Sequence, residues 1–469
     1  MPIKLDLMRF ALIALCCFFY FTICAQDKKS VQSIGWRAGS VELHTISNKQ
    51  QACSFVVGKD SVKAFLIDKT AGAIELFTVK KRMEELFLGA FIKNGNVYLF
   101  MNNGKQPGLH SWRFTLNDKN LTEHVIPFAI KNEKIINRLS GDNHFFYFTV
   151  NKKTSEFIIY KFIDEINFER HNYPVETNIW DAIADRAGLL NAGDINIEKT
   201  DMEGECDIDI AECARKLYVR NDTLLLVLNN QKGTTTVYTF DIVSNNMNKR
   251  VIENKADQDN KLYMVYNSFL LGNKLYYASA TEDALVLQVI DFYSGKVLKE
   301  FTSKSDEEID FKNTPIIQEG NSFVAGVTRE LGKTKQLLRK MTNSRLVITA
   351  LHDDSSHSVI LLLGSYKKVK YYNGGGMWVG SAGAAPIFLP TGGFSRSSWS
   401  KSARFKMLIN DFSSEHINGD IPPSINDKIE VFTAGLKVPS DCENLFLLNE
   451  KYFYAFYDKE ERSLSVVQF

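Results

Sequence analysis

The chain has 469 residues and a formal net charge of +1, with 45% hydrophobic and 24% charged residues. This mixture is typical of globular proteins and excludes long disordered or collagen-like segments. A nearly neutral chain also gives no support for general nucleic-acid binding. Aromatic residues make up 12% of the chain, which favours β-structure because strands prefer aromatic and β-branched side chains.

The first predicted element, residues 1–25, has the pattern of a signal peptide. Lys4 and Arg9 form a basic start, and the apolar run Phe10–Cys24 is short for a membrane span. We expect cleavage after Ala25 and export to the periplasm, the outer membrane or the exterior. An uncleaved anchor is the alternative. A lipoprotein is disfavoured because none of the cysteines in this run follows a small residue. No later segment predicts a transmembrane span.

Residues 26–469 are dominated by a repeated hairpin, in which two alternating strands are joined by a polar turn. Eight copies are found, at Asp60–Val79, Asn94–Leu116, Gly141–Phe162, Asn221–Ile242, Gly272–Phe292, Gly320–Met341 and Asn449–Phe469, with a longer one joining Ser356–Gly364 to Ala403–Ile409. Flanking segments supply one inner and one outer strand for each. Repeats of about 35–50 residues with four short strands are typical of a β-propeller. We therefore predict an all-β single-domain β-propeller with eight blades, or seven as the alternative. A set of two-sheet sandwiches is the runner-up.

The two ends of the chain are expected to meet. The last hairpin ends at the final residue, so its blade lacks an outer strand, and Gly39–Ile46 alternates without another partner. We predict that Gly39–Ile46 fills this place and closes the ring.

Four cysteines remain outside the predicted signal peptide, and an even number in an exported protein suggests disulfides. Three pairings are possible. We favour Cys206–Cys213 as a local staple and Cys53–Cys442 as a clamp on the closing seam. Four buried thiols are the alternative.

A first insert, 173–215, interrupts the strand pattern. Residues 177–191 have helical spacing, and an acidic loop follows at Asp201–Glu212 with six carboxylates. Clustered carboxylates can bind calcium, but the spacing of an EF-hand is missing, so a solvated loop is the favoured interpretation and we predict no metal site.

One repeat resembles a known class. The segment Leu275–Leu298, LYYASATEDALVLQVIDFYSGKVL, is similar to the quinoprotein-type (PQQ-like) and WD40-like propeller repeats. The resemblance implies the propeller fold. It implies no quinone cofactor, because the regular Trp after the turn is missing, and we expect no cofactor.

Two short motifs resemble O-glycosylation acceptors of exported proteins in Bacteroidetes-type bacteria. They are Asp60-Ser61-Val62 and Asp222-Thr223-Leu224. Both lie in turns that suit any Asp, so the motifs hint only at the source of the protein.

A second insert, 366–402, is glycine-rich and carries large apolar residues. The stretch from Val359 to Asn410, which contains the insert and both its flanks, has no Asp or Glu, whereas it holds seven Lys and Arg residues. Trp faces stack on sugars or apolar side chains, and cations meet anionic groups. We predict a partner-binding surface formed by Trp378, Phe388, Phe394, Arg396, Trp399 and Lys401. A loop packed over its own blade is the alternative.

The enzyme motifs that we sought are absent from the sequence. Gly326…Gly332-Lys333-Thr334 has one residue too many for a P-loop, and there is no nucleophile-elbow or HExxH motif. We name no catalytic residues. The favoured function is an exported, non-catalytic propeller that binds an envelope protein or glycan through the rim that bears both inserts. An envelope hydrolase or lyase with an active site in the central cavity, and a structural part of an envelope complex, are the alternatives.

Overall fold

The protein is described here by a computed structural model. It describes residues 30–36, 41–48, 50–104, 108–151, 153–175, 179, 183, 197–200, 206–230, 234–253, 264–320, 328–353, 356–373, 376–379, 387–390, 395–436, 438 and 442–469, with backbone alone at 230 and within 368–399. The predicted signal peptide, 1–25, lies outside these residues. No helix among the described residues is long and apolar enough to cross a membrane.

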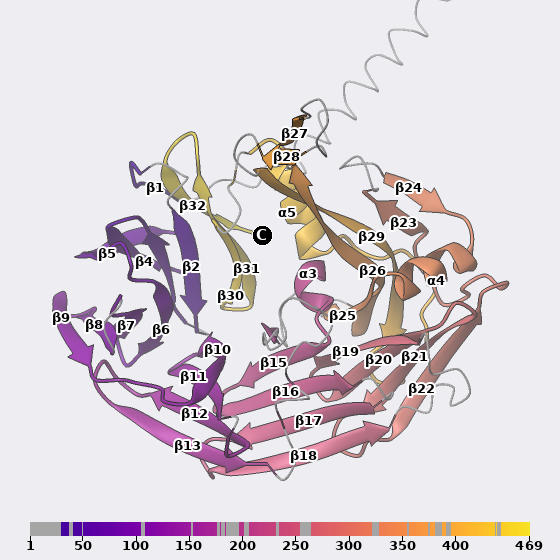
Figure 1. Ribbon diagram of the computed structural model, residues 1–469, viewed down its shortest axis with the longest axis horizontal. Helices are drawn as coiled ribbons and strands as arrows, with labels where there is room; N and C mark the ends of the chain where they lie inside the picture. The colour runs from indigo at the N-terminus through magenta and orange to yellow at the C-terminus, as the bar shows by residue number, and fades with distance from the viewer. Residues whose placement is uncertain are drawn as a thin grey trace, which may run out of the picture. The chain divides into compact units, whose positions relative to one another are not determined.

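The chain divides into two compact units, and each is described by itself. The first unit combines Met1–Asp181 with Pro423–Phe469, and the second is Ala182–Pro422. Figure 1 shows the strands of each sheet lying side by side.

The first unit contains four sheets of four strands each. Three are meanders of consecutive strands. The first consists of β2(Glu42–Ser47), β3(Ala52–Val57), β4(Ser61–Ile67) and β5(Ala73–Lys80), and the second of β6(Phe87–Lys93), β7(Asn96–Asn102), β8(Leu109–Thr115) and β9(Asn120–Ile126). The third consists of β10(Glu133–Ser140), β11(Phe145–Asn151), β12(Glu156–Phe162) and β13(Phe168–Pro174). The fourth joins β30(Glu443–Leu448), β31(Lys451–Asp458) and β32(Ser463–Gln468) to β1(Ser30–Ser33). The helix α5(Ile425–Thr433) precedes β30.

The second unit contains three sheets of four or five strands and a short ribbon. The first sheet runs from β14(Glu198–Lys199) through β15(Arg215–Arg220), β16(Thr223–Asn230) and β17(Thr234–Asp241) to β18(Asn246–Glu253), and the second from β19(Val265–Leu271) through β20(Lys274–Ala280) and β21(Ala284–Asp291) to β22(Val297–Lys304). The third has the order β24(Thr328–Leu331), β23(Ile316–Glu319), β29(Ser395–Asn410), β26(Ser358–Asn373), β25(Arg345–Asp353), and the ribbon pairs β27(Gly376–Val379) with β28(Ile387–Pro390).

The described residues therefore form seven sheets of four or five strands in chain order, with a strand from the N-terminal end completing the last one. This is the strand order of a seven-bladed β-propeller, and the all-β prediction is confirmed. Seven of the predicted hairpins are present, and seven blades, the alternative count, is the one observed. The described part of Gly320–Met341 forms no blade of its own, because it contributes the edge strand β24 to the sheet of β26 and β29 and then most of the helix α4(Thr334–Thr342).

The closing strand is β1 and not Gly39–Ile46. β1 pairs antiparallel with β32, from Ser30 opposite Val466 to Ser33 opposite Ser463. The predicted segment forms β2 instead, which pairs with β3. Both segments are short and alternating, so local pattern does not distinguish them.

The predicted clamp between Cys53 and Cys442 is absent. Both residues carry buried thiols that are not joined in a disulfide. The Cys442 thiol donates a hydrogen bond to the carbonyl oxygen of Val41 at 3.0 Å, whereas Cys53 packs in a different apolar cluster. Burial raises the pKa of the Cys53 thiol.

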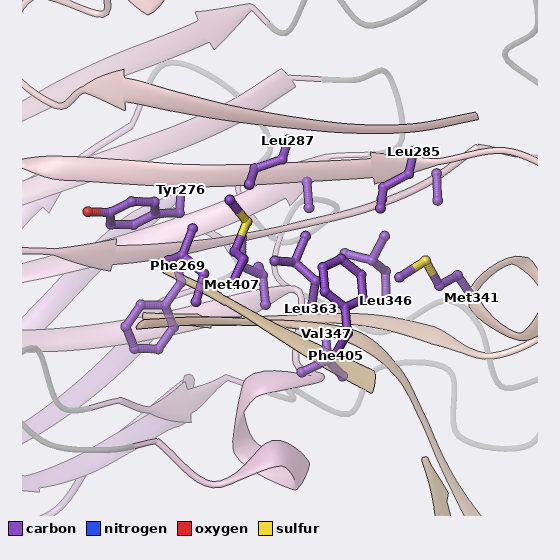
Figure 2. Packing of buried hydrophobic residues seen from close by; sticks show 14 of the residues in the cluster. Phe269, Tyr276, Leu285, Leu287, Met341, Leu346, Val347, Leu363, Phe405 and Met407 are labelled. Atoms are coloured by element: carbon purple, nitrogen blue, oxygen red, sulfur yellow. The ribbon is translucent and has the colours of Figure 1, made fainter. Parts of the chain in front are cut away.

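The largest apolar core of the second unit lies between its second and third sheets. Figure 2 shows its side chains, with Leu285 and Leu287 from β21 and Leu363 and Met407 from β26 and β29 in the same cluster. Met341 of α4 joins them from the helix. This core fixes α4 and the paired strands β26 and β29 relative to each other.

Candidate functional site

The second predicted insert continues a long strand pair. β26 and β29 pair over their full lengths, from Ser358 opposite Asn410 to Asn373 opposite Ser395. β25 pairs with β26 only as far as Tyr366, so a two-stranded ribbon extends beyond that residue. This confirms the predicted long hairpin.

The predicted contact residues that the structure describes lie on two strand pairs, β27 with β28 and β26 with β29. Trp378 is the register partner of Phe388 between β27 and β28, and Trp399 pairs opposite Val369. Phe394 lies outside the described residues, and Arg396 is described by its backbone alone, opposite Tyr372. A binding role for these residues stays a prediction.

Lys401 is the predicted contact residue whose side chain is described. It stands opposite Lys367 at the base of the ribbon, and both line a cavity of about 380 Å³. Five of the twelve lining residues are cationic and none is acidic. The lining consists of Gln318, Arg329, Leu331, Gln336, Arg339, Lys340, Asn343, Ser344, Ser365, Lys367, Lys401 and Ser402. We call this space the cationic cavity.

The helix α4 forms one wall of the cationic cavity because its sequence is amphipathic. Thr334, Leu337, Leu338 and Met341 are buried on one face. The lining residues from the helix and its C-terminal end have the spacing i, i+3, i+4 and i+7 of the opposite face: Gln336, Arg339, Lys340 and Asn343. Cations in the last turn also complement the helix dipole, which gives Arg339 and Lys340 a structural role as well.

Arg329 is held in place by a buried amide. It pairs opposite Gln318 between β24 and β23, and its Nε and Nη2 both donate to Gln318 Oε1, at 3.2 and 3.0 Å. Gln318 is buried, and its own amide nitrogen donates to the carbonyl oxygen of Gly320 at 3.0 Å. The guanidinium is therefore oriented before any ligand arrives.

The positive charges of the cationic cavity act on one another. Burial lowers the pKa of the Lys340 ammonium, and three other cations of the cavity lower it further: Arg329, Lys401 and Arg339. The carboxylate of Glu319 is not part of the lining but borders it, because it accepts from Arg404 at 2.7 Å and from the lining residue Ser402 at 3.3 Å. The cavity is thus a concentrated positive site.

The described part of the acidic insert lies beside the base of the ribbon. Glu212, just after α3(Ile208–Ala211), is 3.8 Å from Arg345, which pairs opposite Tyr366. Burial raises the pKa of Tyr366, and so do the charges of Asp209 and Glu212. Both inserts therefore reach one end of the same sheet. Of the predicted helix 177–191, Ile179 and Ile183 are described, and both are buried.

Neither a calcium site nor the local disulfide is found in the described part of this insert. Within that part of the chain no group of three or more His, Cys, Asp or Glu side chains could hold a metal ion. The prediction of a Cys206–Cys213 disulfide is wrong, because both residues carry buried thiols that are not joined. Both pack inward beside α3, whose buried Ala211 belongs to the same core as Cys206.

Sequence reasoning missed Arg329, Arg339 and Lys340. The signal was present in TKQLLRKMT, where Leu337, Leu338 and Met341 have the spacing of a helix face. The helical spacing was overlooked because Gly320–Met341 was interpreted as another hairpin.

The chain was compared with known protein families, curated proteins and solved structures. No family model and no curated protein matches the chain. Among solved structures, the SapL1 lectin in complex with alpha methyl fucoside is 8% identical with a TM-score of 0.26, and covers 70% of this chain and 90% of its own. The WD40 domain of SCAP from fission yeast is 7% identical with a TM-score of 0.31, and covers 94% and 98%. At these values the similarity does not indicate what this chain binds.

Proposed function

We propose that this protein is an exported, non-catalytic β-propeller that binds an anionic envelope protein or glycan. The binding surface is the insert 366–402 together with the cationic cavity at the base of the β26–β29 ribbon. The observation that carries the proposal is this cavity, which gathers five cations and no acid in a chain whose charges are otherwise balanced.

The placement of the cavity supports binding at this end of the sheet. Binding residues on rigid scaffolds commonly lie on the loops and extensions that project from them. Here a ribbon projects beyond Tyr366, and the cationic cavity lies where it leaves the sheet. A partner with negative charge would contact both the ribbon and the cavity.

The test is binding to immobilised polymers of known charge. Protein lacking residues 1–25 is passed over polyphosphate, dextran sulfate, polygalacturonate and neutral dextran. We expect binding to at least one anionic polymer, weakened by added salt because Debye screening shortens the reach of exposed charges. Equal binding to neutral and anionic polymers, or to none of them, would overturn the proposal.

Charge-matched variants test whether the cationic cavity is the part of the molecule that binds. Arg339→Gln with Lys340→Gln removes two charges from the cationic cavity. Lys296→Gln with Lys304→Gln removes two exposed charges from the same unit, outside the cavity lining. We expect the first pair to weaken anionic binding about tenfold or more and the second to change it little. Equal effects of the two pairs would mean that overall charge, and not this site, is responsible.

Export is proposed from the sequence of residues 1–25. The mass of the mature chain, isolated from its natural source, should correspond to a start at Gln26. A mass that includes residues 1–25 in a soluble cytosolic fraction would contradict export.

A further inference from the structure

We propose that the cationic cavity recognises a tetrahedral oxyanion ester, a phosphate or sulfate group carried by the partner, in preference to a carboxylate. This inference rests on the proposed function and names the chemical group that its site selects. It follows from how the positive groups surround the space, from their number and from the size of the space.

The cations enter the cavity from three parts of the fold. Arg329 comes from the edge strand β24, Arg339 and Lys340 come from α4, and Lys367 and Lys401 come from the base of the paired strands β26 and β29. A planar carboxylate offers two oxygens in one plane and suits a single two-pronged arginine. A phosphate or sulfate ester offers three oxygens pointing in different directions, which suits donors that converge from several elements.

The neutral lining residues also favour an acceptor-rich ligand. Gln336 and Asn343 carry amide groups and Ser365 carries a hydroxyl, so hydrogen-bond donors complement the cations around the space. Ser402 adds no donor, because its hydroxyl donates to Glu319, and the Asn343 amide already donates once, to the carbonyl oxygen of Arg339. The charged terminal oxygens of a phosphate or sulfate ester accept stronger hydrogen bonds from such groups than a neutral hydroxyl of a sugar does.

The repulsion among the cations favours a ligand with more than one negative charge or with charge spread over several oxygens. Lys340 is half-buried, and the charges of its neighbours already disfavour its own charge. A ligand that approaches several cations at once relieves this repulsion, and a single carboxylate reaches fewer of them. Arg329 adds a guanidinium that Gln318 has already oriented, so less conformational freedom is lost on binding.

The volume of the cavity indicates that the phosphate or sulfate group is part of a larger ligand. A cavity of about 380 Å³ is larger than a bare phosphate or sulfate ion needs and lies within the usual range of small-ligand sites. We infer that the cavity also accommodates part of the molecule that carries the ester, such as a sugar ring.

The test uses small molecules and the chain without residues 1–25, by isothermal titration calorimetry at matched ionic strength. Inorganic phosphate, sulfate and acetate are compared first, and then glucose 6-phosphate, glucose 6-sulfate and glucose. We expect at least one tetrahedral anion to bind about tenfold or more tightly than acetate, and its sugar ester to bind more tightly than the free ion. The two esters distinguish a phosphate source from a sulfate source.

Variants connect the result to the cavity. Lys340→Gln and Arg329→Gln should each weaken ester binding about tenfold, Lys340→Arg should restore most of it, and Lys304→Gln should leave it unchanged. Acetate binding as tightly as phosphate and sulfate, or an ester affinity that Lys340→Gln and Lys304→Gln change equally, would overturn the inference. If the anionic polymers still bind in either case, the proposed function stands while the inference fails. If no polymer binds, the proposed function itself fails.

Discussion

At the scale of single residues, a buried lysine shows most clearly how polar groups are accommodated in the second unit. Lys216 is fully buried, and its ammonium donates to the carbonyl oxygen of Cys213 at 2.5 Å and to Asn267 Oδ1 at 2.7 Å. The Asn267 amide in turn donates to the carbonyl oxygens of Ala211 and Leu346, each at 2.8 Å. This network ties the end of α3 to β15, β19 and β25.

Lys216 should make stability depend on pH in the alkaline range. Burial lowers its pKa from 10.5 to about 8, so the folded state disfavours the charged form. Between these two values the unfolded chain binds more protons than the folded chain, and stability therefore rises with pH. From about pH 7 to about pH 9 we expect the free energy of unfolding to gain about 1 kcal/mol from this group.

The measurement is denaturant unfolding of wild type and Lys216→Met at both pH values. The variant leaves two buried acceptors without their donor, so it should be less stable at each pH. Its stability should lack the gain between the two pH values, and an equal gain in both proteins would contradict the assignment. If the variant does not fold, a wild-type stability that falls or stays constant over this range contradicts it instead.

At the scale of elements, the sequence predicted most strands but misplaced one segment. The seven observed hairpins were identified because alternating apolar residues on both sides of a polar turn form a local signal. Gly320–Met341 carried a similar turn, yet its second half is the helix α4, whose apolar residues follow the period of a helix. The cationic cavity could not be predicted, because it depends on α4 lying beside β24 and the base of the ribbon.

Replacement of a core residue of α4 should destabilise the second unit. Leu338 is fully buried in the cluster that also contains Leu363 and Phe405. Leu338→Ala removes buried apolar surface and leaves a cavity, which we expect to cost about 2–5 kcal/mol. Lys335→Ala, at an exposed position of the same helix, should change stability by less than about 0.5 kcal/mol.

Chemical denaturation of both variants measures these differences. Equal stability of Leu338→Ala and wild type would mean that α4 does not pack as described.

At the scale of the whole chain, the prediction of a closing N-terminal strand is confirmed, whereas the prediction of disulfides is wrong. That an N-terminal strand completes the last sheet followed from an unfinished blade, and it is confirmed. Which segment supplies the strand did not follow, because short alternating segments near the N-terminus suit an open edge equally well. The disulfides failed for a related reason, since an even number of cysteines carries no information about which sulfur atoms approach each other.

Contacts around β1 show why its segment is the one that closes the sheet. The backbone nitrogens of Ile34 and Gly35 both donate to the carbonyl oxygen of Arg462, at 2.9 and 3.0 Å. The Gln32 side-chain amide donates to the carbonyl oxygen of Ala73 at 2.7 Å, and the Ala73 nitrogen donates to Ser30 Oγ at 3.0 Å. β1 thus bonds to the last sheet and to the hairpin of the first sheet within one unit.

Removal of this strand should therefore destabilise the first unit and expose the edge of β32. A chain that begins after Gly35 loses the pairing of β1 and the buried side chain of Ile34, whereas a chain that begins at Ser30 keeps both. We expect the shorter chain to unfold at a melting temperature lower by about 5 °C or more and to aggregate, because an unpaired strand edge can pair with other chains. Ile34→Ala, which keeps the strand but removes buried apolar surface, should cost about 2–5 kcal/mol. Equal melting temperatures for the two truncated chains would show that β32 does not need β1.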